Sequence, residues 1–153
     1  MNFMDFQADL LGYPEEDIVF VGLGNRMRGD DAAGLELLDM IKKSGFFPGS
    51  TFISAGTNPE NYLQQILSAH PKLVVFLDAC DFRDRPGEIR WLDYDEIEKA
   101  GISTHAYSMT MIERYLNLER ITECRYLAIQ PGFLDEENGL SSETRQGLLR
   151  FLD

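Results

Sequence analysis

The sequence predicts an α/β fold with a mostly parallel sheet. Apolar segments typical of strands alternate along the chain with segments of helical periodicity, which is the pattern of successive βα units. The stretch 73–77 is continuously apolar, as expected for a strand with both faces covered by helices. The 153 residues suit one domain of ordinary size. We assign residues 18–153 to a single α/β domain and residues 1–17 to an N-terminal lead-in.

The first half of the chain is expected to contain two strand–helix units after a short lead-in helix. Leu35, Leu38 and Ile41 follow one another at helical spacing, and Gly45 provides a left-handed C-cap at little cost. Pro59 suits the first turn of the second helix of these units. The predicted elements are a helix over 3–11, a strand over 18–23, a helix over 35–43, a strand over 51–53 and a helix that begins at 58–60.

The second half is expected to add three strands and two helices. Residues 88–92 alternate between polar and apolar side chains after a Pro86-Gly87 turn, which indicates a less buried strand. Pro131 stops the last strand. The predicted elements are a strand over 72–77, the strand over 88–92, a loop over 102–105, a helix over 108–118, a strand over 126–129 and a closing helix over 141–152.

Composition narrows the class of function. The net charge of −12 disfavours nucleic acid as a partner, because the phosphate backbone would be repelled. Cys80 and Cys124 form no CxxC pair, which disfavours a disulfide scaffold or a thiolate zinc site and suits a reducing compartment. We find no secretory signal and no membrane-spanning stretch, so we expect a cytoplasmic protein that does not bind membranes. Nothing in the sequence demands a second copy, and we expect a monomer.

Three side chains are candidates for a metal site. Asp31 follows the first predicted strand, Asp78 follows the strand over 72–77, and His105 lies in a loop before a helix. The carboxyl ends of parallel strands share one edge of a sheet, so these side chains can meet in one crevice. Carboxylate oxygen and imidazole nitrogen suit a divalent transition metal such as nickel or zinc. Three such ligands would leave positions open for substrate or water.

Plainer interpretations remain open for each of these residues. Asp31 could cap the helix that follows it, Asp78 could cap a turn, and His105 could be a solvated loop residue. Cys80 fits a small apolar residue, since no histidine is near it in sequence. Asp81 and Asp84 lie in a charged loop and are expected to be solvated.

A nucleotide-binding interpretation is possible but weak. Gly22 and Gly24 match the start of a dinucleotide-binding fingerprint, but Met27 stands where its third glycine should be. The chain has no Gly-Lys-Ser/Thr element of a phosphate-binding loop. The adjacent carboxylates of Asp30 and Asp31 would also repel a pyrophosphate from the start of the helix.

Five separated motifs together resemble the nickel–iron hydrogenase maturation endopeptidases. Their order and spacing cover most of the chain, from residue 18 to about residue 133. One departure is Ala55, which stands where many members carry a second glycine and resists positive φ. The motifs are Gly22-Leu23-Gly24-Asn25 with Asp30-Asp31 and Gly34, then Ala55-Gly56-Thr57, Asp78-Ala79-Cys80-Asp81 with Pro86-Gly87-Glu88, Thr104-His105, and Ile129-Gln130-Pro131.

The resemblance implies a three-layer α/β/α sandwich with a five-stranded sheet. It also implies removal of a C-terminal extension from the precursor of a hydrogenase large subunit, after nickel has been inserted. The metal-contacting positions of the family correspond to Asp31, Asp78 and His105, the same three that the strand ends select. The nickel is then supplied by the precursor, with zinc or cadmium as possible surrogates.

The resemblance also bears on substrate binding and on the attacking group. Gly24 and Asn25 would shape the loop beneath the metal, and Gly56 and Thr57 would help to dock the substrate strand. No serine or cysteine nucleophile with an evident base lies in the motifs, so either a metal-bound water or a carboxylate acting as general base remains open. The alternatives to a protease are a non-catalytic nickel-sensing chaperone of the precursor and a nucleotide-binding domain.

Overall fold

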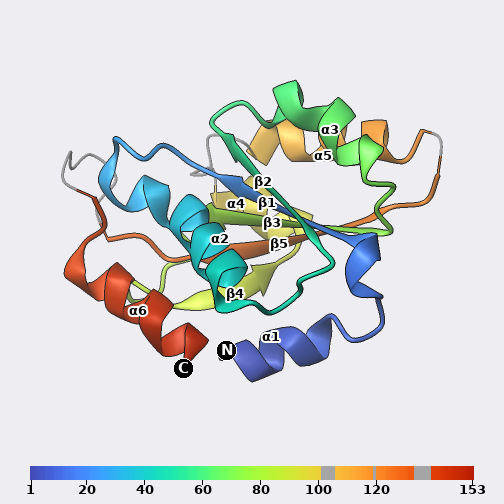
Figure 1. Cartoon of the computed structure of the whole chain (residues 1–153). Coiled ribbons are helices and arrows are strands. Elements are labelled where there is room, and N and C mark those ends of the chain that lie inside the picture. The colour runs from blue at the N-terminus through green and yellow to red at the C-terminus, as the bar shows by residue number, and fades with distance from the viewer. Residues whose placement is uncertain (101–105, 119, 133–138) are drawn as a thin grey trace.

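The computed structural model describes residues 1–100, 106–118, 120–132 and 139–153, with the side chains of 98–100 and 106–108 excepted (Figure 1). Its centre is a five-stranded sheet with strand order β2-β1-β3-β5-β4. Four strands are parallel, and β4 pairs antiparallel with β5 at one edge, which confirms the mostly parallel sheet. The strands are β1 (Ile18–Leu23), β2 (Thr51–Gly56), β3 (Leu73–Ala79), β4 (Ile89–Leu92) and β5 (Glu123–Ile129).

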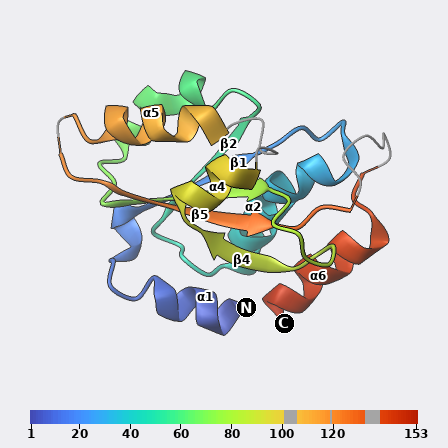
Figure 2. The same ribbon diagram turned by 180° about the vertical axis from the view of Figure 1, so that it is seen from behind.

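Helices cover both faces of the sheet, as expected for a three-layer sandwich (Figures 1 and 2). One face packs against α1, α2 and α6, and the other against α3, α4 and α5. The helices are α1 (Phe3–Asp9), α2 (Ala33–Ser44), α3 (Leu63–Ser68), α4 (Tyr94–Ala100), α5 (Ala106–Leu116) and α6 (Ser142–Leu152), with short 3₁₀ turns η1 (Glu15–Asp17), η2 (Gly29–Ala32) and η3 (Pro59–Tyr62).

The central strands alternate their side chains between two apolar cores. In β3, Val75 and Leu77 belong to the core under α2, whereas Val74 and Phe76 belong to the core under α3 and α5. All seven residues of β3 are buried. This explains the continuous apolar run, because a strand in the middle of a doubly covered sheet has no solvent face.

The lead-in is part of the first core. Phe3, Phe6 and Leu10 are buried, and Phe6 stacks on Trp91 of β4 with ring centroids 5.7 Å apart. Asn2 begins α1 with a capping box, in which its side chain accepts from the N–H of Asp5. None of the helices in the described ranges is long and apolar enough to cross a membrane.

Two strands continue beyond their predicted ends, and β5 begins at Glu123, earlier than the predicted residue 126. β2 continues through Gly56 instead of ending at residue 53, since it pairs with β1 to its end. β3 continues through Ala79, because Asp78 and Ala79 pair with Ala128 and Ile129 of β5. Asp78 therefore lies inside the strand and does not follow it.

One helix, α4, was not predicted. The sequence cue for this helix is the pair Asp93 and Glu96, three residues apart, which forms a capping box. The N–H of Glu96 donates to Asp93 Oδ1 at 2.8 Å, and the N–H of Asp93 donates to Glu96 Oε1 at 3.3 Å.

Candidate functional site

The carboxyl ends of β1 and β3 form the topological switch point of the sheet. β1 lies between β2 and β3, and the chain leaves β1 through α2 on one face and returns to β3 through α3 on the other. Open α/β sheets bind ligands in the crevice at such a point. The loop after β1 and the last residues of β3 lie at this point of the sheet.

The loop after β1 closes on itself through glycine. Gly24 has a φ of 133°, and a Cβ built on it would lie 1.9 Å from the carbonyl oxygen of Asp31. Its N–H donates to the carbonyl of Gly56 at 3.0 Å, and the next N–H, that of Asn25, donates to the carbonyl of Asp31 at 3.2 Å. The Asn25 side chain then accepts from the N–H of Met27 at 2.8 Å. Gly24, Asn25, Gly56 and the backbone of Asp31 are thus brought together, and Thr57 follows at the exposed end of β2.

Asp31 is half-buried in η2, which contacts β3. The helix α2 can approach the sheet closely because Gly34, its second residue, has no side chain. A Cβ on Gly34 would lie 2.2 Å from the carbonyl oxygen of Leu77 and 2.6 Å from that of Leu23. The start of α2 therefore rests directly on the backbone of β1 and β3. This packing places η2 beside the strand that carries Asp78.

Asp78 is 1 % exposed and belongs to the face of the sheet covered by α3, α4 and α5. The alternation of β3 decides this, because Phe76 and Cys80 on either side of it lie in that core. The hydroxyl of Tyr126 in β5 donates to Asp78 Oδ2 at 2.5 Å. A carboxylate in this setting is held by the fold and is not a solvated turn residue.

His105 lies outside the described residues. The helix α5, which begins at the next residue, packs on the same sheet face as Asp78. Among the residues that the structure does describe, no three His, Cys, Asp or Glu side chains are grouped so as to hold a metal ion. The three-ligand site thus stays a prediction, of which the structure places Asp31 and Asp78.

Asp30 has a structural role that sequence reasoning missed. It is fully buried and accepts hydrogen bonds from the N–H of Gly132, the N–H and hydroxyl of Ser141, and the hydroxyl of Thr144, all between 2.7 and 2.8 Å. Ser141 is also the N-cap of α6. One carboxylate thus fastens η2 to the start of the last helix. Its donors lie more than a hundred residues away in sequence, so no local pattern could reveal them.

Comparison with known proteins decides the family. A family model described as hydrogenase maturation protease matches residues 35–151, which include Asp78 and His105 and begin after Asp31. The hydrogenase 3 maturation protease of Escherichia coli K12 is 35% identical over 116 residues, covering 74% of this chain and 72% of that protein. The chain belongs to the hydrogenase maturation protease family.

Two further relatives come from Methanocaldococcus jannaschii, and both are called putative hydrogenase maturation proteases. One is 29% identical over 125 residues, covering 77% of this chain and 74% of that protein. The other is 34% identical over 83 residues, and the match spans about half of each protein, 54% in both cases.

Solved structures of maturation proteases share the fold. A [NiFe] hydrogenase maturation protease from Thermococcus kodakarensis superposes with a TM-score of 0.72 at 27% identity, covering 88% of this chain and 86% of that one. An endopeptidase from E. coli superposes with a TM-score of 0.71 at 27% identity, covering 86% and 84%. Family and fold are those expected from the motifs, and the family is one of peptide hydrolases. Neither a non-catalytic chaperone nor a nucleotide-binding domain is favoured.

In this family member, the loop after β3 is ordered by Gln130, which sequence reasoning used only as a strand end. Its Oε1 accepts from the N–H of Phe82 at 2.9 Å and of Asp84 at 3.2 Å, and its Nε2 donates to Asp81 Oδ1 at 3.0 Å. Asp81 is only partly exposed. The expectation that Asp81 is simply solvated is therefore wrong, because its carboxylate helps to fix the loop beside Asp78.

Cys80 is packed as the small apolar residue that the sequence indicated. It is 1 % exposed, and burial together with the nearby charge of Asp78 raises the pKa of its thiol to about 12. Burial likewise raises the pKa of the Cys124 thiol to about 12. Neither thiol suits a nucleophile, since the thiolate is the reactive form.

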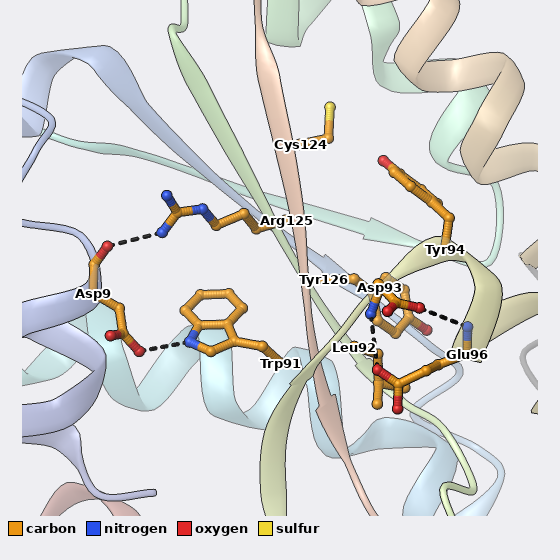
Figure 3. A pocket seen from close by; sticks show the side chains of 9 residues that line it. All are labelled: Asp9, Trp91, Leu92, Asp93, Tyr94, Glu96, Cys124, Arg125 and Tyr126. Carbon is orange, nitrogen blue, oxygen red and sulfur yellow. Dashed lines mark hydrogen bonds between the residues drawn. The ribbon is translucent and has the colours of Figure 1, made fainter.

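A separate cavity of about 710 Å³ lies toward the amino-terminal half of β5, away from the loop after β1 (Figure 3). Trp91 and Arg125 reach across its edge to α1: the indole N–H donates to Asp9 Oδ2 at 2.8 Å, and Arg125 Nη1 donates to the Asp9 carbonyl at 2.8 Å. Tyr126 lies in its wall. None of the carboxylates of the maturation protease motifs lines this cavity.

Proposed function

We propose that this chain is an endopeptidase that removes a C-terminal extension from the precursor of a [NiFe]-hydrogenase large subunit. The observation that carries the proposal is the family match, joined to the position of Asp31 and Asp78 at the switch point of the sheet. The reaction is hydrolysis of one peptide bond. Water adds to the scissile carbonyl carbon, the C–N bond breaks, and the released amine takes up the proton.

Recognition of nickel is the second part of the proposal. Asp31, Asp78 and His105 bind the nickel ion that the precursor already carries. The metal is therefore part of the substrate and signals that nickel has been inserted. Carboxylate and imidazole ligands suit nickel, and zinc or cadmium could stand in for it. Shared coordination would hold the precursor against the two carboxylates and so bring the scissile bond close to them. The water is activated either by the cation or by a carboxylate acting as general base.

Docking of the substrate is assigned to the glycine-rich rim of the site. Gly24 and Asn25 shape the loop, and Gly56 and Thr57 meet the extended substrate. Support comes from the hydrogen bond between Gly24 and Gly56, which fixes the two segments side by side, and from the position of β2 at an edge of the sheet. Edge strands can accept an added strand. The replacement of glycine by Ala55 leaves this strand stiffer than a Gly-Gly loop.

The first experiment tests nickel gating. Purified protein is incubated with nickel-loaded and with nickel-free precursor, and the mass of the precursor is followed. We expect a mass loss only for the loaded form. Equal cleavage of both forms would exclude gating, and no cleavage of either would favour a non-catalytic sensor of nickel loading.

The second experiment tests the three ligands. Asp31→Asn, Asp78→Asn and His105→Ala should each abolish processing of the loaded precursor. Asp95→Asn, on the exposed first turn of α4, is the matched control and should process normally. Full processing by all three ligand variants would overturn the assignment.

A cytoplasmic location and a monomeric state complete the proposal, with the two free cysteines as support for a reducing compartment.

A further inference from the structure

We infer that Tyr126 is a positioning residue for Asp78. This inference rests on the proposed function, since it assumes that Asp78 binds the nickel of the precursor. The observation is a hydrogen bond of 2.5 Å from the tyrosine hydroxyl to Asp78 Oδ2. Tyr126 is 3 % exposed and Asp78 is 1 % exposed, so water does not compete for this bond.

The sheet register explains how Tyr126 reaches the carboxylate. Directly opposite Asp78 in β5 stands Ala128, and Tyr126 lies two residues before it, opposite Phe76. Residues two apart in a strand point to the same face, so all of these side chains share the face under α3, α4 and α5. Because Ala128 is small, the long tyrosine side chain can pass along the face to its diagonal neighbour.

The hydroxyl fixes the orientation of the Asp78 carboxylate. A hydrogen bond between an O–H and a carboxylate is short and strong in a buried site. With Oδ2 held by Tyr126, the plane of the carboxylate and the direction of its other oxygen are set before a cation arrives. Partners of this kind are known to tune metal ligands, and their removal costs about 10- to 100-fold in metal affinity or activity.

The rest of the molecule offers a matched control. Tyr13 also donates its hydroxyl to a carboxylate, that of Glu123, but this pair is solvent-exposed and lies at the opposite end of β5. Tyr13→Phe and Tyr126→Phe therefore remove the same bond type at two separate places along β5. Only the second change touches the proposed ligand.

The test compares nickel binding and processing. The full chain is titrated with nickel chloride by calorimetry, and KM and kcat are measured on nickel-loaded precursor. Tyr126→Phe should weaken nickel binding about 10- to 100-fold and lower kcat/KM by a similar factor, while Tyr13→Phe stays within about twofold. Nickel affinity and processing within about twofold of the original for Tyr126→Phe would overturn the inference.

A double-mutant cycle separates positioning from a general effect on folding. If Tyr126 acts through Asp78, adding Tyr126→Phe to Asp78→Asn should not weaken nickel binding further. An equal further loss in that background would show that the tyrosine acts otherwise. The cycle also separates this inference from the proposed ligand role of Asp78: unchanged nickel binding and processing in Asp78→Asn would overturn that ligand role, whereas an effect of Asp78→Asn without one of Tyr126→Phe would overturn only the positioning role.

Discussion

Asp30 and Asp31 are neighbours in the chain but have different surroundings. Asp30 is fully buried with four donors around its carboxylate, and Asp31 is half-buried in η2. The hydrogen bonds of Asp30 hold two parts of the chain together, whereas Asp31 stands where a ligand could reach it. In this acidic pair, Asp30 therefore has a structural role, whereas Asp31 is a candidate ligand.

Substitution at these two positions should separate stability from activity. Asp30→Asn replaces an acceptor by an amide N–H₂ that meets donors, so the free energy of unfolding should fall by about 1–3 kcal/mol. Asp31→Asn should abolish processing but lower the free energy of unfolding by no more than half of that amount. Urea denaturation and the precursor assay on both variants check this. A larger loss of stability in Asp31→Asn than in Asp30→Asn would contradict it.

The two thiols should be inert at neutral pH. The pKa of Cys80 and of Cys124 is raised to about 12, so the thiol form persists until the pH approaches that value. At pH 8 the thiolate fraction is on the order of 1 in 10,000. Iodoacetamide should therefore modify the folded chain far more slowly than the urea-unfolded chain, as read by mass spectrometry. Rapid alkylation of folded chain with loss of processing would instead indicate a cysteine nucleophile.

At the scale of elements, backbone contact between α2 and the sheet brings η2 to β3. Gly34 allows this contact, because any side chain there would meet the carbonyl oxygens of Leu77 and Leu23. The residue after Leu77 is Asp78. A shift of α2 away from the sheet would therefore affect the positions of both candidate carboxylates, those of Asp31 and Asp78.

Gly34→Ala should test this contact. Alanine is ordinarily the better residue in a helix, but here the added methyl group must push α2 from the sheet, and overpacking of this kind costs about 1–3 kcal/mol. Gly12→Ala is the matched control, because a Cβ there meets nothing within 4 Å. We expect lower stability in urea and reduced processing for Gly34→Ala, and neither for Gly12→Ala. A variant as stable and active as the control would show that α2 can shift freely.

Most elements could be predicted because their apolar residues recur at a helical or strand period. The bounds of β1 match those predicted, and those of α2 and α6 lie close to them. The end of β3 was missed because Asp78 is polar, and only its pairing with Ala128 keeps it in the strand. At the site, the motif residues could be named, but the partners Tyr126 and Thr144 could not. Those contacts depend on strand register and on how α6 packs.

At the scale of the whole molecule, the N-terminal helix closes the core beneath the sheet. Phe6 is fully buried. The centroid of its ring lies within 6.1 Å of the ring centroids of Phe3, Phe20, Phe47, Trp91 and Phe151. These rings come from the lead-in, the sheet, the loop after α2 and the last helix. The lead-in thus contributes to folding although it carries no motif of the family.

Phe6→Ala should therefore destabilise the entire fold. Loss of a buried phenylalanine side chain costs about 3–5 kcal/mol. Met4→Ala, in the same helix at 77 % exposure, should change little. Thermal unfolding followed by circular dichroism would show a lower Tm for Phe6→Ala only. Equal transitions for both variants would mean that α1 does not unfold together with the rest.

The carboxylate of Asp30 also has a consequence for the evolution of this chain. It binds Gly132 on one side and Ser141 on the other, so both borders of the stretch 133–140 are anchored at a single point. Insertions and deletions within that stretch would then leave the borders where they are. A change in the length of this stretch should therefore leave Asp31 and the last helix in their places.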